Sequence, residues 1–173
     1  MSSPHGSTLV VRDERADDLQ AIRDLHVQAF GQDQEARIVD ALRSNGAVLS
    51  SLVAAEGDRI LGHILYSPAT IGALAGAALG PMAVLPACQR QGVGARLIAE
   101  GTRRLKAAGC PFVIVVGHPD YYPRFGFTPP GSRGITCEWD VPADVFMVQV
   151  LDDARMQGVS GLAKYREEFS SVS

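Results

Sequence analysis

The residues best suited to binding chemistry lie in one short segment, Gln89-Arg90-Gln91-Gly92-Val93-Gly94-Ala95. Glycines allow the backbone to turn tightly and to approach a ligand without interference from a Cβ atom. An amphipathic pattern begins within the segment and predicts a helix over residues 94–108. Because the first N–H groups of a helix lack intrahelical partners and the helix dipole is positive at that end, we predict an anion site suited to phosphate.

Two common phosphate-binding loops do not fit this segment. A dinucleotide-binding loop requires Gly-x-Gly-x-x-Gly directly after its strand. Here Leu97 stands at the third glycine position, and residues 86–91 separate the glycines from the preceding apolar run. A nucleoside-triphosphate loop requires Gly-Lys-Ser/Thr, which this segment lacks. The glycine spacing therefore disfavours a nucleotide-dependent oxidoreductase.

The segment instead resembles the acetyl-CoA loop of the GNAT superfamily, Gln/Arg-x-x-Gly-x-Gly/Ala, because Gln89, Gly92 and Gly94 match that loop in order. Further along, Tyr122-Pro-Arg-Phe-Gly-Phe resembles the Tyr-x-x-x-Gly-Phe signature of the same family. The wider run Gly-His-Pro-Asp-Tyr-Tyr-Pro-Arg-Phe-Gly-Phe is similar to a GNAT subgroup of predicted N-acetyltransferases. The two motifs in this order are more specific than either alone, and the resemblance covers residues 9–127.

The resemblance implies that acetyl-CoA is the co-substrate and that no metal takes part. In the family, the loop amides bind the CoA pyrophosphate, and the strand ahead of the loop pairs with the pantetheine arm as another β-strand would. Carried over by position, the acetyl-CoA-binding residues are Met82, Ala83, Val84, Gln89, Arg90, Gln91, Gly92, Val93, Gly94 and Ala95.

The family chemistry also implies a role for a tyrosine. When an amine attacks the thioester carbon, the leaving thiolate must be stabilised or protonated. A phenol with a pKa near ~10 can donate to a thiolate whose thiol has a pKa near ~8.5. Alignment to the signature implies that Tyr122 is the general acid. Its neighbour Tyr121 is the main rival, because a shift of one residue in the alignment would exchange the two.

The resemblance does not identify the general base. Many family members place a carboxylate on the strand that precedes the CoA loop, but residues 79–84 contain no acid. Glu56 falls at an expected hairpin tip, which argues against it. His63 and His118 are the remaining candidates near the motifs, since histidine ordinarily titrates near neutral pH. A water relay is the other alternative.

The implied function is an N-acetyltransferase that moves acetyl from acetyl-CoA to a primary amine of a small molecule or a peptide. The alternative is a catalytically silent GNAT-fold domain that senses CoA or mediates assembly, and the missing acid is the feature that favours it. The presence of Tyr122 and of the whole CoA loop favours the enzyme. A homodimer is left open.

Apolar periodicity predicts the elements that position these motifs. Helices are expected over residues 19–30, 35–44 and 94–108, and strands over 9–11, 48–55, 60–66, 77–84, 112–116, 135–138 and 145–151. A compact turn is expected over 120–125 with Asp120 as its N-cap. Residues 68–78 have no clear assignment, and the tail from residue 156 is undecided between strand and helix.

The order strand, loop, helix, strand in the middle of the chain predicts two parallel strands joined by a right-handed crossover. The resemblance implies a GNAT-type α/β fold with a mixed sheet. That sheet is expected to be mostly antiparallel, with a central parallel pair flanked by helices.

Composition indicates an ordinary globular protein, with 46% hydrophobic and 20% charged residues. Its 173 residues fit one domain spanning 1–173. Within it, residues 1–7 are expected to be disordered, and residues 128–173 are expected to supply acceptor-side strands and a tail. The net charge of −3 gives no basic footprint, so no nucleic-acid partner is expected.

The cysteine spacing and the hydropathy of the chain indicate the cellular location that we expect for this protein. The three cysteines are widely spaced and form no Cys-x-x-Cys pair, so neither a disulfide framework nor a zinc site is predicted. No apolar run reaches the ~18 to 20 residues that span a bilayer. The first eight residues contain no hydrophobic signal core. We therefore expect no membrane partner and a cytoplasmic location.

Overall fold

The computed structural model describes residues 8–171, so the disorder predicted for residues 1–7 lies outside the described residues. The strands are β1 (Leu9–Asp13), β2 (Ser50–Glu56), β3 (Arg59–Ile71), β4 (Leu74–Val84), β5 (Phe112–Val116), β6 (Phe127–Thr128), β7 (Ile135–Cys137), β8 (Phe146–Val150) and β9 (Gly161–Lys164). They form a sheet in the order β1-β2-β3-β4-β5-β8-β6, and β9 pairs with β3 and β7. Pairing is antiparallel except for β4–β5 and β7–β9, which confirms the predicted mixed sheet with a central parallel pair.

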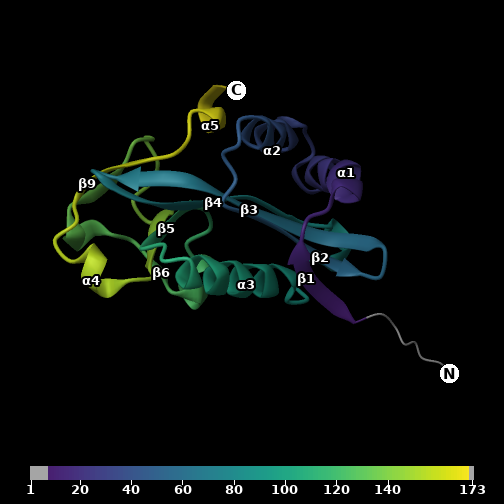
Figure 1. Ribbon diagram of the computed structural model, residues 1–173. Helices are drawn as coiled ribbons and strands as arrows, with labels where there is room; N and C mark the ends of the chain where they lie inside the picture. Colours follow the sequence, from purple (N-terminus) through teal and green to yellow (C-terminus); the bar gives the residue numbers. More distant parts are fainter. Residues whose placement is uncertain (1–7, 172–173) are drawn as a thin grey trace.

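Helices cover both faces of the sheet (Figure 1). On one face lie α1 (Leu19–Phe30) and α2 (Gln34–Ser44), and on the other lies α3 (Val93–Ala107). These bounds confirm the three predicted helices to within one residue. The undecided tail contains both β9 and the short α5 (Glu168–Ser171), preceded by α4 (Asp153–Met156). None of the helices between residues 8 and 171 is long and apolar enough to cross a membrane.

The side chains of β2 point alternately to the two faces of the sheet and so contribute to the hydrophobic core on each face. Leu52 packs in the cluster that contains Leu97 of α3, whereas its neighbour Val53 packs with Leu25 of α1 and Leu42 of α2. Successive strand residues point to opposite faces, which produces this division. All five side chains are almost completely buried. Full burial of one such side chain stabilises the fold by about 1.5–3 kcal/mol.

The Ala- and Gly-rich residues 68–78 complete β3 and begin β4 around a turn at Gly72. Gly72 adopts a left-handed φ of +57°. Gly76 lies against the ring of Phe112, because a Cβ atom built on it would come within 2.5 Å of that ring. Small residues therefore let β4 lie close to Phe112. The sequence pattern alone does not state this packing requirement.

The predicted N-cap at Asp120 is wrong. The 3₁₀ turn spans Tyr122–Phe125, its N-cap is Tyr121, and no side chain caps it. Proline fixes its own φ and is tolerated only at the start of a helical segment. Pro123 therefore sets the beginning of the turn, and Asp120 falls one residue too early. Gly126 ends the turn with a left-handed φ of +90°.

The parallel strands β4 and β5 diverge after a short contact. They pair only at Ala77 with Val113 and at Ala78 with Ile114. Beyond that point β4 carries an irregularity: Leu79 pairs with Tyr66 of β3 and Met82 with Ile64, so β4 has one residue more than β3 in this interval. The end of β4, residues 82–84, continues to pair with β3 and leaves its other edge free of β5.

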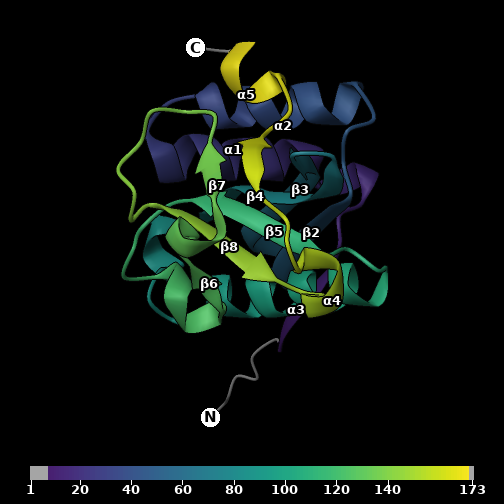
Figure 2. The same ribbon diagram turned by 90° about the vertical axis from the view of Figure 1, so that its left-hand side faces the viewer.

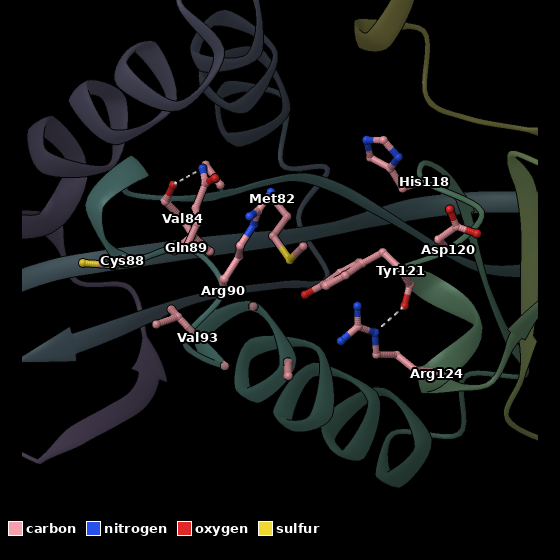
Figure 3. Close-up of a pocket in the computed structure, with 14 residues that line it drawn as sticks. Met82, Val84, Cys88, Gln89, Arg90, Val93, His118, Asp120, Tyr121 and Arg124 are labelled. Carbon is pink, nitrogen blue, oxygen red and sulfur yellow. Dashed lines mark hydrogen bonds between the residues drawn. The ribbon is translucent and has the colours of Figure 1, made fainter.

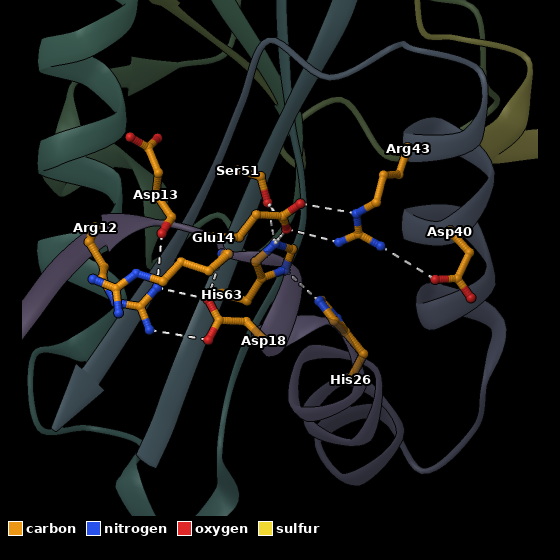
Figure 4. A network of polar contacts seen from close by, with 10 residues as sticks. Arg12, Asp13, Glu14, Asp18, His26, Asp40, Arg43, Ser51 and His63 are labelled. Carbon is orange, nitrogen blue, oxygen red and sulfur yellow. Dashed lines mark hydrogen bonds and ion pairs between the residues drawn. The ribbon is translucent and has the colours of Figure 1, made fainter. Parts of the chain in front are cut away.

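A buried polar network joins β1, β2 and β3 to α1 and α2 (Figure 4). His63 lies at its centre, with Nδ1 hydrogen-bonded to His26 at 2.9 Å and Nε2 hydrogen-bonded to Ser51 at 2.7 Å. Ser51 donates to Glu14 at 2.5 Å, and Arg43 donates to both oxygens of Glu14 at 2.8 and 3.0 Å. Both histidine side chains are completely buried.

Burial controls the protonation of this network. Desolvation lowers the pKa of His26 to about 3, and the nearby His63 and Arg43 act in the same direction. Desolvation also lowers the pKa of His63, although the nearby carboxylate of Glu14 acts against this. For Glu14, burial acts to raise the pKa, but the nearby His63 and the hydrogen bonds from Arg43 and Ser51 outweigh it and hold the pKa well below the usual range. The fold therefore favours neutral histidines beside an ionised carboxylate.

We expect the free energy of unfolding to fall as the pH drops from 6.5 towards 5. The unfolded chain protonates both histidines near pH 6.5, whereas the folded state keeps them neutral. Their contribution is thus complete above pH 6.5 and is lost as the pH falls towards the depressed folded-state pKa values. The slope of the free energy of unfolding against pH should approach about 1.4 kcal/mol per pH unit for each histidine. Urea unfolding at pH 8, 7, 6 and 5 measures it.

The matched variants for this measurement are His26→Gln and His118→Gln. The glutamine at position 26 retains a hydrogen-bonding group but cannot titrate, so it should reduce the slope. His118 is exposed, and its replacement should leave the slope unchanged. Equal slopes in the wild type and in His26→Gln would contradict the expected neutral state of this network.

Candidate functional site

The space where β4 and β5 diverge opens into a cavity of about 660 Å³, called here the loop cavity. Figure 3 shows the end of β4, the loop that follows it, the N-terminus of α3 and the segment after β5 around this space. Its size falls within the range of small-molecule sites. Its lining residues are Met82, Ala83, Val84, Cys88, Gln89, Arg90, Gly92, Val93, Gly94, Ala95, His118, Asp120, Tyr121 and Arg124.

The structure brings together every residue that the resemblance assigned to acetyl-CoA except Gln91. The Gln91 side chain instead donates to the carbonyl of Ala87 at 3.2 Å. Gln89 lines the loop cavity while its side chain donates to the carbonyl of Val84 at 3.2 Å. These two amides fix the loop to the strand and the turn that precede it.

The loop presents an uncapped helix N-terminus to the cavity. Gly92 is the N-cap of α3, with a left-handed φ of +86°, and it supplies no side-chain hydrogen bond to the helix. Arg90 also adopts a positive φ, 64°, which is uncommon outside glycine. The first helical hydrogen bond runs from Arg96 N–H to the Gly92 carbonyl, so the N–H groups of residues 93–95 precede the intrahelical bonds. These amides and the positive end of the helix dipole form an anion site.

Tyr121 reaches across the loop cavity towards α3 (Figure 3). A Cβ atom built on Gly94 would lie 2.5 Å from the Tyr121 hydroxyl oxygen, so the glycine makes room for this approach. Arg124 lies over the Tyr121 ring at 4.8 Å from its centroid and donates to the Tyr121 carbonyl at 3.2 Å. Burial raises the pKa of Tyr121, although Arg124 acts against this.

A second cavity of about 490 Å³ lies beside the first and is called here the aromatic cavity. Met82, His118 and Tyr121 line both cavities, so the two spaces meet at these residues. The other walls come from α1 and α2, from the irregular part of β4, from the end of β5 and from the C-terminal segment. The following residues line the aromatic cavity and not the loop cavity: Phe30, Glu35, Ile38, Leu79, Gly80, Pro81, Val115, Val116, Gly117, Tyr122, Trp139, Tyr165 and Phe169.

Tyr122 lines the aromatic cavity and not the loop cavity. Its ring packs edge-on against Phe127, with 5.6 Å between the centroids, and a Cβ atom on Gly117 would overlap with it. The glycine that opens the motif around Tyr122 is therefore required by the position of this ring. Burial, followed by the proximity of Tyr121, raises the pKa of Tyr122 well above the usual range. The phenol keeps its proton at neutral pH.

The structure separates the two candidate bases. His118 is exposed at the junction of the two cavities. His63 is 0% exposed, belongs to the polar network around Glu14, and lines neither cavity. We therefore do not retain His63 as a base. The reason is the strand alternation, which turns the His63 side chain to the face of the sheet that α1 covers.

Much of the aromatic cavity could not be predicted from the sequence. Glu35, Tyr165 and Phe169 belong to no recognisable motif. They come from α2 and from the C-terminal segment, which only the tertiary fold brings together. In the part of the chain that the structure describes, no group of three His, Cys, Asp or Glu side chains is arranged to hold a metal ion.

Comparison with known proteins relates this site to a family. Residues 19–127 match the Acetyltransferase (GNAT) family. The chain is 31% identical over 165 residues to the protein named uncharacterized N-acetyltransferase YhbS of Escherichia coli (strain K12). That match covers 94% of this chain and 99% of the relative.

Solved structures show the same fold. A crystal structure of the GNAT family N-acetyltransferase YhbS from Escherichia coli in complex with CoA is similar with a TM-score of 0.91 and 29% identity, over 98% of this chain and 96% of that one. A GNAT family acetyltransferase from Brucella melitensis in complex with acetyl-CoA is similar with a TM-score of 0.79 and 34% identity, over 94% of this chain and 99% of that one.

Proposed function

This chain belongs to the GNAT family of acetyltransferases, and we propose that it transfers an acetyl group from acetyl-CoA to a primary amine. The observation that carries the proposal is the loop cavity, where a free strand edge meets an uncapped helix N-terminus. The CoA and acetyl-CoA complexes of the similar proteins support the same ligand here. When bound, acetyl-CoA supplies the acetyl group as a reactive thioester.

The residues of the loop cavity fit such a ligand. The amides of residues 93–95 suit the charge of a pyrophosphate, and the guanidinium of Arg90 adds a positive charge at the same wall. The free edge of residues 82–84 offers backbone groups to the amides of a pantetheine arm. Gly94 lets the Tyr121 hydroxyl approach the helix end, so this ring closes one side of the cavity.

We propose Tyr122 as the general acid, on its match to the family signature and its place in the wall of the aromatic cavity. The amine nitrogen forms a bond to the thioester carbon, and the carbon–sulfur bond breaks. Tyr122 donates its proton to the departing sulfur, and the proton lost by the amine restores the phenol through solvent. The phenol of Tyr122 holds its proton at neutral pH, so it has a proton to donate when the sulfur leaves.

We propose His118 as the base that takes the proton from the amine. Its position at the junction of the loop cavity and the aromatic cavity supports this assignment. The amine must approach the thioester from the aromatic cavity, so its proton is released near this junction. A base within reach of the nitrogen, directly or through one water molecule, is what the step requires.

The alternative of a silent CoA-binding domain has no specific observation in its favour once His118 is available at the junction. We also propose that residues 1–173 act as one domain in which residues 128–173 supply the acceptor side. Trp139, Tyr165 and Phe169 support this division because they line the aromatic cavity and not the loop cavity.

The first test concerns the left-handed cap of α3. Gly92→Ala should weaken acetyl-CoA binding at least tenfold in calorimetry, because strain at a φ of +86° displaces the amides of the anion site. The matched control is Gly109→Ala just beyond the other end of α3, where φ is +83° and nothing lies within 4 Å of the added Cβ. Both variants should lose about 1 kcal/mol of stability, but only Gly92→Ala should lose affinity. Equal affinities would remove the loop from the binding site.

The second test compares the two neighbouring tyrosines. Tyr122→Phe should lower kcat by about 10²-fold or more with little change in the KM for acetyl-CoA, because only proton donation to sulfur is removed. Tyr121→Phe should act mainly on KM, since that ring lines the loop cavity. Steady-state thiol release measures both constants. A large loss of kcat in Tyr121→Phe with normal kcat in Tyr122→Phe would transfer the role to Tyr121.

The third test varies pH to isolate the base. His118→Gln should lower kcat/KM for the amine by about 10²-fold at pH 7. The defect should shrink as the pH rises towards 10, because an alkylamine with a pKa of about 10.4 then enters already deprotonated. A merely structural role would leave the ratio of wild type to variant independent of pH, and that result would exclude His118 as the base.

A further inference from the structure

The wall of the aromatic cavity includes a stack of rings from the C-terminal segment. Trp139 and Tyr165 stack with 4.2 Å between centroids and 20° between ring planes. Phe169 packs edge-on against Tyr165 at 5.1 Å. β9 pairs with β7 (Figure 2), and Phe169 beyond β9 packs against the cluster that contains Ile38 of α2, which places this segment next to α2. The three rings contact one another and line the cavity.

Glu35 brings a carboxylate to the same cavity from the first turn of α2. Its side chain is half-buried and accepts from the Gln32 amide at 3.3 Å. Among the described residues that line the aromatic cavity there is no lysine or arginine. A carboxylate and aromatic rings in a cavity whose lining contains no lysine or arginine favour a positively charged ligand.

The hydroxyl group of Tyr165 lies beneath this wall. Its oxygen is buried, lies near the backbone of Val116 and makes no hydrogen bond. A buried hydroxyl without a partner costs roughly 1–3 kcal/mol. Because this oxygen is not accessible from the cavity, Tyr165 contributes its ring and not its hydroxyl to the wall.

We propose that the aromatic cavity selects a protonated amine with an apolar body, held by the carboxylate of Glu35 and by the rings of Trp139, Tyr165 and Phe169. The apolar body lies against Leu79 and Val115 at the base of the cavity. This inference rests on the proposed function, because it specifies the acceptor of that transfer. Amines that also carry a carboxylate are disfavoured beside Glu35.

Trp139 makes the proposal directly measurable, because it is the only tryptophan in the sequence. With CoA present, n-hexylamine, 1-hexanol and hexanoate are titrated at pH 7.5 while tryptophan fluorescence is followed. These probes share an apolar chain and differ in charge at the head group. We expect n-hexylamine to bind about tenfold more tightly than 1-hexanol and hexanoate to bind most weakly.

Two variants separate the contacts. Glu35→Gln should abolish the preference for n-hexylamine over 1-hexanol, while Glu56→Gln, outside both cavities, should retain it. Tyr165→Phe should leave the binding of n-hexylamine unchanged, because the aromatic ring is kept, and should raise the thermal midpoint, because the unpartnered hydroxyl is removed. A preference that survives Glu35→Gln would make Glu35 only a helix-dipole residue and would overturn the proposal, as would equal binding of amine and alcohol to the wild type.

Calorimetry with acetyl-CoA on the same samples separates the two levels of the proposal. If acetyl-CoA binds but the amine and the alcohol bind equally, the inference about the acceptor fails and the proposed function stands. If acetyl-CoA does not bind, the proposed function itself fails, whatever the fluorescence titration shows.

Discussion

The rest of the site depends on the early separation of β4 and β5. Two parallel strands ordinarily satisfy each other's backbone groups along their length. Here the shared pairing covers Ala77 and Ala78 on β4, and residues 82–84 then face open space on one edge. Buried backbone groups without partners are costly, so an edge of this kind must meet solvent or a ligand. The crossover through α3 brings the helix N-terminus to the same opening, which joins a strand edge and an anion site in one cavity.

The polar network around His63 fixes α1 and α2 to the face of the sheet that they cover. It connects Glu14 after β1, Ser51 of β2 and His63 of β3 to His26 of α1 and Arg43 of α2. The ring of His26 is also parallel to that of Phe30, with 6.0 Å between their centroids, and Phe30 lines the aromatic cavity. The position of that wall therefore depends on neutral imidazoles at the sheet surface. His63, which the sequence suggested as a base, has this structural role instead.

How far the sequence predicted the structure depended on whether the determining interactions were local. Helix periodicity, the turn residues and the order of strand, loop, helix and strand gave the three long helices and the central parallel pair. The two motifs also led to the lining of the loop cavity, because its residues are nearly contiguous. The strand segment before residue 77 was undecided, since its small residues are explained by packing against Phe112. Most residues that line the aromatic cavity could not be predicted, because residues such as Glu35 and Tyr165 come together only in the folded chain.

The two cavities are built mainly from different segments of the chain, so each can change in evolution without the other. The loop cavity is built from residues 82–95 and 118–124, whereas α1, α2 and the C-terminal segment supply much of the aromatic cavity. Substitutions at positions such as Phe30, Trp139 or Phe169 can therefore remodel one chamber while the other keeps its shape. After a gene duplication, one copy could therefore acquire a different acceptor through substitutions in the aromatic cavity while its loop cavity stayed unchanged.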